Sequence, residues 1–207
     1  MIFKLRIVFL LTTLCGVLAT NLQGQERMLI YGVQGGYSMS NQRWQSFGDR
    51  DALFKPHIDF IFESQDLDKG MSFYSSLGYH LRGSANRGGS FINLSTGNRE
   101  RFLSEMVIRN MVLNLGVKKR AIKASGNAIY YFLALRGEVN VGKEFDFYEA
   151  LEDDVNPVLG GVTLGFGYEW VVPSKGTVVL GLSIQPDFTN QIFVEPEWYD
   201  ADQYYIN

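Results

Sequence analysis

Three stretches in the C-terminal half of the chain alternate between apolar residues and residues that are small or charged. They span residues 129–141, 158–170 and 178–184. Successive side chains of a strand point to opposite faces, so a period of two predicts β-strands with one apolar face. Segments of about 10 residues with this alternation are typical of transmembrane β-barrel strands. The central apolar positions, predicted to face lipid, are Leu133, Leu135, Leu164, Phe166, Leu180 and Leu182.

Four earlier segments show the same alternation, and the connections between strands differ in length. The earlier strands are predicted at 29–39, 58–63, 71–82 and about 105–118. Long polar or Gly-rich loops are predicted at 41–55, 83–102 and 143–156, and short turns at 64–69, 119–125 and 173–176. Long loops therefore alternate with short turns, as in outer-membrane barrels. The sequence predicts an all-β, antiparallel up-and-down transmembrane β-barrel of the eight-stranded type with seven clear strands.

The eighth strand is missing or irregular in this prediction. Closed bacterial barrels of this kind have an even number of strands. Residues 189–207 contain Pro196 and end without alternation, so we expect an outer loop or an incomplete final strand there. We favour truncation of the sequence before its eighth strand. The alternative is an irregular strand over Gln191–Tyr199.

The first 24 residues have the pattern of a secretory signal peptide. Lys4 and Arg6 precede an apolar run over 7–18, and small residues follow. The alternative of an uncleaved anchor is less favoured, because spanning a bilayer takes about 20 apolar residues. Residues 25–188 are the predicted barrel domain. Without a later apolar helix, a secreted chain can span a membrane only as a closed barrel, which predicts the cell outer membrane and its lipids as surroundings.

Six charged residues occupy positions that the alternation turns inward. The interior of an eight-stranded barrel is just wide enough to be filled by side chains. Buried charges there must pair, because an isolated charge is costly to bury. The sequence therefore predicts a salt-bridged interior without an open pore. The predicted network is Asp59, Glu63, Arg82, Arg136, Glu138 and Glu169, with the face of Arg109 left open.

Aromatic residues form two further groups. Tyr37, Tyr168 and Trp170 lie at strand ends, where girdles of aromatic residues mark the membrane interface. Other aromatics fall in the predicted first outer loop and the tail, where they offer a surface for a protein partner. Packing of the loops on each other is the alternative. These residues are Trp44, Phe193, Trp198 and Tyr199.

Motifs that would indicate a catalytic or metal-binding site are weak in this sequence. Ser76 lies four residues before His80 on the predicted inner face, and His57 is the only other histidine. A hydrolase would need one histidine beside a nucleophile and an acid, and a structural hydrogen-bonded pair is the preferred interpretation. The acidic residues at 146–154 lack the ligand spacing of a calcium loop. We predict no catalytic, cofactor or metal site, and the net charge of −3 without a basic face predicts no nucleic-acid partner.

Two short segments carry a resemblance to a known group of proteins. Residues 33–38 read Val-Gln-Gly-Gly-Tyr-Ser, and residues 164–169 read Leu-Gly-Phe-Gly-Tyr-Glu. With the Gln-ended leader, the chain resembles small outer-membrane barrel proteins of Bacteroidetes, the PorT-like and OmpX-like eight-stranded families. The resemblance implies a non-enzymatic structural, adhesive or assembly and secretion-associated role.

Three hypotheses of function stay open from the sequence. The first is the non-enzymatic outer-membrane barrel that acts through its extracellular loops. The second is a lipid-modifying barrel enzyme that uses His80 or His57. The third is a soluble periplasmic, lipocalin-like binder of an apolar ligand. The sequence gives no oligomeric state.

Overall fold

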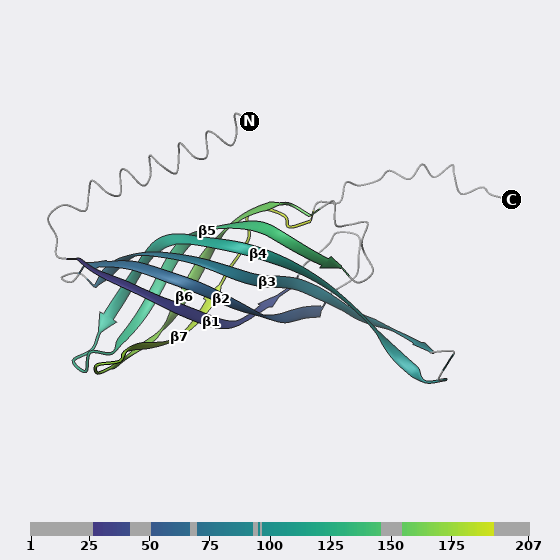
Figure 1. The fold of residues 1–207 in the computed structure, drawn as a ribbon, viewed down its shortest axis with the longest axis horizontal. Coiled ribbons are helices and arrows are strands. Elements are labelled where there is room, and N and C mark those ends of the chain that lie inside the picture. The colour runs from purple at the N-terminus through teal and green to yellow at the C-terminus, as the bar shows by residue number, and fades with distance from the viewer. Residues whose placement is uncertain are drawn as a thin grey trace, which may run out of the picture.

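The chain folds into one antiparallel sheet of seven strands in sequence order. A computed structural model describes residues 27–41, 51–66, 70–92, 95, 97–145 and 155–192. The strands are β1 (Arg27–Ser40), β2 (Asp51–Asp66), β3 (Met71–Ile92), β4 (Arg99–Ile122), β5 (Ala128–Phe145), β6 (Val158–Val172) and β7 (Gly176–Ile184). The described residues contain no helix, and the sheet curls into a half-barrel (Figure 1). The prediction of an all-β antiparallel fold with seven strands is confirmed.

The alternation of the sequence separates the two faces of this sheet. In β5, Ala134 and Arg136 are buried on the concave side, while Leu133 and Leu135 are exposed on the convex side. We call these sides the inner face and the outer face. Two small clusters of buried apolar side chains lie near one end of the sheet. These are Met106, Ile108, Phe145 and Val155, and Leu53, Ala85 and Val107.

Three short turns join the strands at one end of the sheet, which we call the turn end. The turn before β5 closes with a hydrogen bond from the Gly126 N–H to the Lys123 carbonyl (2.9 Å), and Gly126 has a φ of 84°. Ser174 and Gly176, also at positive φ, shape the turn before β7. Such backbone angles favour glycine, because other side chains strain there. The short connections predicted after the second, fourth and sixth strands are confirmed.

Two of the predicted loops are largely strand. β2 begins at Asp51, and Leu53 and Phe54 pair with the end of β1, inside the predicted loop 41–55. The predicted loop 83–102 is a hairpin in which β3 and β4 pair out to Ile92 and Arg99, and it projects beyond the other strands at the end opposite the turns (Figure 1). This hairpin end was missed because its Gly-, Ser- and Asn-rich sequence lacks apolar alternation. Backbone hydrogen bonds hold a two-stranded ribbon without such a pattern.

The two edge strands leave the half-barrel open. β1 pairs with β2 and β7 with β6, and no other strand pairing is formed by either within the described residues. All nine residues of β7 are exposed. Beyond β7 the chain continues along β6 irregularly, with hydrogen bonds from the Phe188 N–H to Gly160 O and from the Asn156 N–H to Gln191 O (both 2.8 Å). Because the strand number is odd, β1 and β7 run in the same direction.

Candidate functional site: the charged inner face

Two acids and two bases form a closed network on the inner face near the turn end. Lys118 Nζ lies 2.8 Å from Glu63 Oε1 and 2.6 Å from Glu169 Oε1. Arg120 donates from Nε to Glu169 Oε2 (2.7 Å) and from a terminal nitrogen to Glu63. The four side chains come from β2, β4 and β6 and are buried. Two positive and two negative charges balance, as burial away from water requires.

A second balanced network lies farther along the inner face, toward the hairpin end. Glu138 Oε1 lies 2.9 Å from Arg82 and 2.7 Å from Arg136 Nε, and neither ion-pair contact has hydrogen-bond geometry. Asn110 Nδ2 donates to the other oxygen of Glu138 at 2.9 Å. Asp187, beyond β7, pairs with both arginines. The side chains of Arg136 and Glu138 are completely buried.

Neutral polar groups fill the space between the two networks. Thr163 Oγ1 donates to Asn114 Oδ1 (2.7 Å), and Asn114 Nδ2 donates to Ser76 Oγ (3.1 Å). This chain of hydrogen bonds crosses from β6 through β4 to β3. Ser76 therefore accepts a hydrogen bond from Asn114. The described residues show no hydrogen bond between Ser76 and His80.

The two histidines form a third cluster on β2 and β3, level with Asn110 of the second network. His80 Nε2 lies 2.9 Å from Asp59 Oδ1, and the His57 and His80 ring centroids are 4.9 Å apart. Ser38 Oγ lies 2.9 Å from His57 Nδ1, and His57 Nε2 lies 3.9 Å from Asp59 Oδ2. Three neighbouring strands, β1, β2 and β3, thus place a hydroxyl, two imidazoles and a carboxylate within contact of one another.

Small residues make room for the aromatic side chains of the inner face. A Cβ added at Gly165 would come within 2.1 Å of Phe132 Cε1, and one at Gly181 within 2.2 Å of the Tyr130 hydroxyl. Tyr74 packs on Phe132 with ring centroids 4.9 Å apart. The glycines of β6 are thus packing positions within a strand. A phosphate-binding glycine loop requires a strand-to-helix junction, which is lacking here.

All six charged residues of the predicted network lie on the inner face and are buried. Each is less than 8% exposed: Asp59, Glu63, Arg82, Arg136, Glu138 and Glu169. Arg109, whose face the sequence left open, lies on the outer face and pairs with Glu144 at 2.6 Å. Sequence reasoning missed Lys118, Arg120 and Asp187. The alternation Asn114, Gly116, Lys118, Arg120 continues past the predicted strand end at Lys118 and could have identified the two bases.

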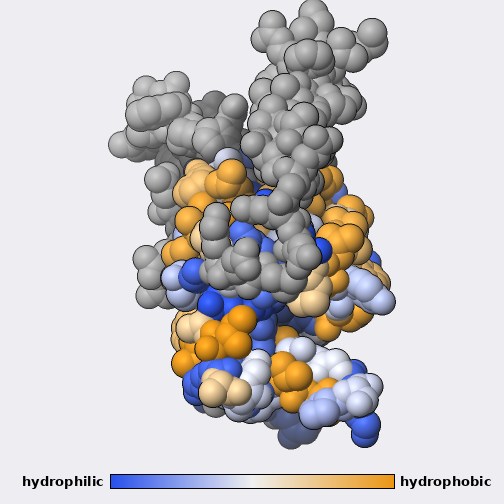
Figure 2. Space-filling view, turned by 90° about the vertical axis from the view of Figure 1, so that its left-hand side faces the viewer, coloured by the Kyte–Doolittle hydropathy of each residue, from blue (hydrophilic) through white to orange (hydrophobic). Residues whose placement is uncertain are grey.

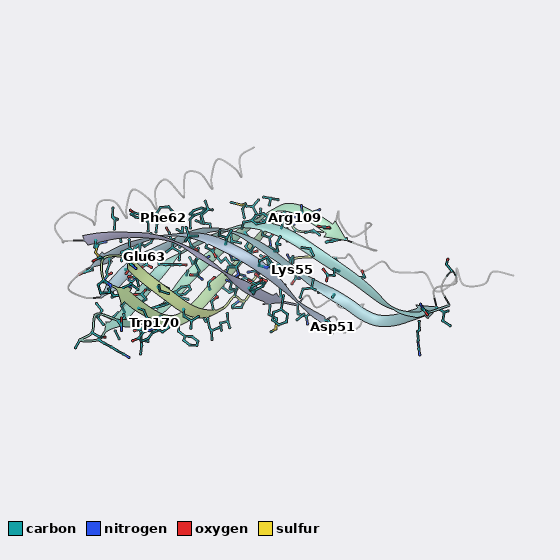
Figure 3. All side chains as sticks on the ribbon, turned by 60° about the horizontal axis from the view of Figure 1, so that its bottom comes forward. Asp51, Lys55, Phe62, Glu63, Arg109 and Trp170 are labelled. Atoms are coloured by element: carbon teal, nitrogen blue, oxygen red, sulfur yellow. The ribbon has the colours of Figure 1, made fainter. Side chains whose placement is uncertain are left out.

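The outer face carries the apolar side chains. The six positions predicted to face lipid are 41–69% exposed: Leu133, Leu135, Leu164, Phe166, Leu180 and Leu182. Phe62 and Glu63 are neighbours in β2, yet Phe62 is 56% exposed and Glu63 is 4% exposed, so they occupy opposite faces (Figure 3). Seen along the sheet, hydrophobic residues flank a hydrophilic middle (Figure 2). This polarity is the reverse of that of a soluble β-sandwich.

The predicted girdle residues lie at opposite ends of the sheet. Tyr37 is exposed near the hairpin end of β1. Tyr168 and Trp170 lie near the turn end of β6, with ring centroids 4.6 Å apart, and Lys123 Nζ is 4.9 Å from the Tyr168 ring centre. The predicted signal peptide and the predicted partner surface, Trp44, Phe193, Trp198 and Tyr199, lie outside the described residues.

The described part of the chain lacks a metal-binding cluster and a membrane-spanning helix. No group of three or more His, Cys, Asp or Glu side chains there is placed to hold a metal ion. In the same residues, no helix has the length and apolarity needed to cross a membrane. No known protein family, curated protein or solved structure matches this chain. The fold and the inner face define an antiparallel β half-barrel with a charged, internally paired interior.

Proposed function

We propose that this chain is an outer-membrane β-barrel protein whose outer face contacts lipid and whose interior is filled by paired side chains. Its role is structural, adhesive or assembly- and secretion-associated, exerted through the connections opposite the short turns. The observation that carries the proposal is the inverted polarity of the sheet, with ion pairs inside and large apolar side chains outside. In lipid this arrangement is favourable, because hydrocarbon solvates the apolar face and the interior satisfies its own charges.

The height of the apolar belt supports this proposal. On the outer face of β4, charged Arg109 and Lys119 bracket Met111, Leu113, Leu115 and Val117. Ten residue steps at about 3.3 Å each span about 33 Å along the strand. A strand tilt of about 40° reduces this length to about 25 Å along the membrane normal, the usual height of the apolar band of such barrels.

The interior argues against the soluble-binder hypothesis. A lipocalin-like binder encloses an apolar ligand, and its inner face must be apolar to do so. Here the inner face holds two balanced ion-pair networks and a chain of neutral hydrogen bonds. An apolar ligand bound on this face would contact charged groups to which it offers no hydrogen bonds.

Insertion into lipid sets a requirement for the two edges. Hydrocarbon offers no partner for free backbone N–H and C=O groups, so β1 and β7 must both be covered in the membrane. The two edge strands run in the same direction, so a direct β1–β7 contact would be parallel. One further strand running opposite to both satisfies both edges with antiparallel pairing, which is the eighth strand of the proposed barrel.

The connections opposite the turns are where a partner would bind. The β3–β4 hairpin projects past the apolar belt, and Ile92 near its tip is 63% exposed (Figure 1). Within the described residues this ribbon pairs with no third strand beyond Ala85 and Met106, which suits it to adding a strand from another protein. The resemblance to PorT-like proteins favours an assembly or secretion-associated partner over a small-molecule ligand.

Membrane fractionation of cells that express the full chain tests the proposal. We expect the protein in the outer-membrane fraction after alkaline carbonate washing, with a gel mobility that changes on boiling. A periplasmic marker protein that washes away is the control. Recovery of folded protein in the aqueous fraction would contradict the proposal.

A further inference from the structure

The Ser38–His57–Asp59 contacts have the form of a nucleophile, a base and an orienting acid. Ser38 Oγ is 2.9 Å from His57 Nδ1, within the reach expected of a nucleophile and its base. On the opposite edge of the same ring, His57 Nε2 faces Asp59 Oδ2 at 3.9 Å. One imidazole thus connects a hydroxyl with a carboxylate, and the triad is recognised by such roles and geometry rather than by chain order.

The surroundings of Asp59 favour the proton arrangement that a general base needs. Asp59 is buried, and its other oxygen accepts a hydrogen bond from His80 Nε2 at 2.9 Å. Asp59 Oδ2 lies beyond hydrogen-bond distance of His57 Nε2, so it favours a proton there only through its charge. With the proton on Nε2, His57 Nδ1 carries the lone pair that can accept the Ser38 hydroxyl proton. His80 acts as a positioning residue for Asp59.

A cavity gives this hydroxyl access to substrate. It has a volume of about 660 Å³ and lies along the seam between the edge strands β1 and β7, so substrate reaches it only while no further strand closes this seam. Ser38, His57 and Arg82 line it together with Tyr130 and Phe132 from the inner face and with the edge of β7. Its mixed lining suits a polar ester group with an apolar chain. The guanidinium of Arg82 in this lining is already paired with Glu138 and Asp187.

We propose that Ser38 and His57 form the catalytic pair of a hydrolase site for fatty-acyl esters, with Asp59 and His80 as positioning residues. Ser38 Oγ attacks the ester carbonyl carbon while His57 Nδ1 takes the hydroxyl proton. Collapse of the tetrahedral intermediate breaks the acyl C–O bond, and His57 returns that proton to the leaving alcohol. Water, deprotonated by His57, then attacks the acyl-serine and releases the fatty acid. This activity goes beyond the proposed structural role.

Covalent labelling of the full chain, refolded in detergent micelles, tests the site. A fluorophosphonate probe should form an adduct that peptide mass mapping places on Ser38. Ser38→Ala should abolish the adduct, and His57→Ala should slow labelling by about 10²-fold or more. Ser183→Ala is the matched control, because Ser183 on β7 lines the same cavity but is not among the groups that contact His57. The Ser183→Ala variant should label like the wild type.

Substrate turnover supplies the second measurement. Hydrolysis of p-nitrophenyl decanoate should exceed that of the butyrate ester, and Asp59→Asn should lower kcat more than it changes KM. Boiling-dependent gel mobility verifies that each variant is folded. Folded wild-type protein without an adduct on Ser38 overturns the proposal, even if Ser38→Ala fails to fold. Because labelling is done in detergent, this result is independent of where the protein resides in the cell.

Discussion

Single residues on the inner face depend on their partners for stability. Glu138 shows this dependence most clearly, because its fully buried carboxylate faces two arginines and an asparagine. Replacing only one member of such a network leaves opposite charges uncompensated away from water. The arginines would keep only the partly exposed Asp187 as an acid within contact.

Glu138→Gln should therefore destabilise the fold by about 3–5 kcal/mol. The measurement is the free energy of unfolding from urea titration of protein folded into phospholipid vesicles. Glu144→Gln is the control, because Glu144 pairs with Arg109 on the exposed surface, and its loss should cost less than about 1 kcal/mol. Equal effects of the two variants would show that the inner face is hydrated like the surface.

Gly→Ala substitutions on the two faces of the sheet should also differ in their effect on stability. A Cβ at Gly116 would lie 2.0 Å from Leu133 O and 2.5 Å from Ala134 Cα, and backbone atoms cannot move aside as a side chain does. Gly116→Ala should destabilise by about 1–3 kcal/mol in the same titration. A Cβ at Gly137 meets nothing within 4 Å, so Gly137→Ala should stay within about 0.5 kcal/mol of the wild type. If Gly116→Ala left the free energy of unfolding unchanged, β4 and β5 would have to lie farther apart than described.

At the scale of elements, alternation predicts a strand only where one face is apolar. The seven strands and the inward positions of Arg136 and Glu138 follow from the period of two, because those residues alternate with Leu135 and Val139. The ends of the strands cannot be predicted from this period. Lys119–Ser125 reads as a basic turn, yet β4 continues to Ile122, and the inner acids Glu63 and Glu169 pair with Lys118 and Arg120 there. That pairing joins residues far apart in sequence, as does the contact of Ser38 with His57, so local pattern cannot show it.

Depth along β4 should set the cost of a charge on the outer face. Leu115 lies in the middle of the apolar belt and Met111 lies next to its charged border at Arg109. In lipid, Leu115→Arg should cost about 2–4 kcal/mol and Met111→Arg about 0–1 kcal/mol, because the penalty falls toward the interface. Urea titration in vesicles measures both variants. Similar costs at both positions would contradict a lipid-facing belt.

At the scale of the whole molecule, the half-barrel combines a closed polar interior with an open seam. The ion-pair networks connect β2 with β4 and β6, and β3 with β5 and with Asp187 beyond β7, so they hold opposite walls together. The seam between β1 and β7 contains the cavity beside Ser38. Among the described residues the interior is therefore filled by paired side chains and open at the seam between β1 and β7, where the proposed eighth strand would lie.

Planar-bilayer recording tests whether the interior is blocked. We expect no steady large conductance, because the buried, ion-paired side chains of Glu63, Lys118, Arg120 and Glu169 fill the inner face at the turn end. Removing a complete pair in Glu63→Ala with Lys118→Ala keeps the net charge unchanged and leaves Arg120 bonded to Glu169. That double variant should show brief openings that the wild type lacks. A steady open channel in the wild type would show that the ion pairs line a pore instead of filling it, and the proposed structural role would then give way to transport.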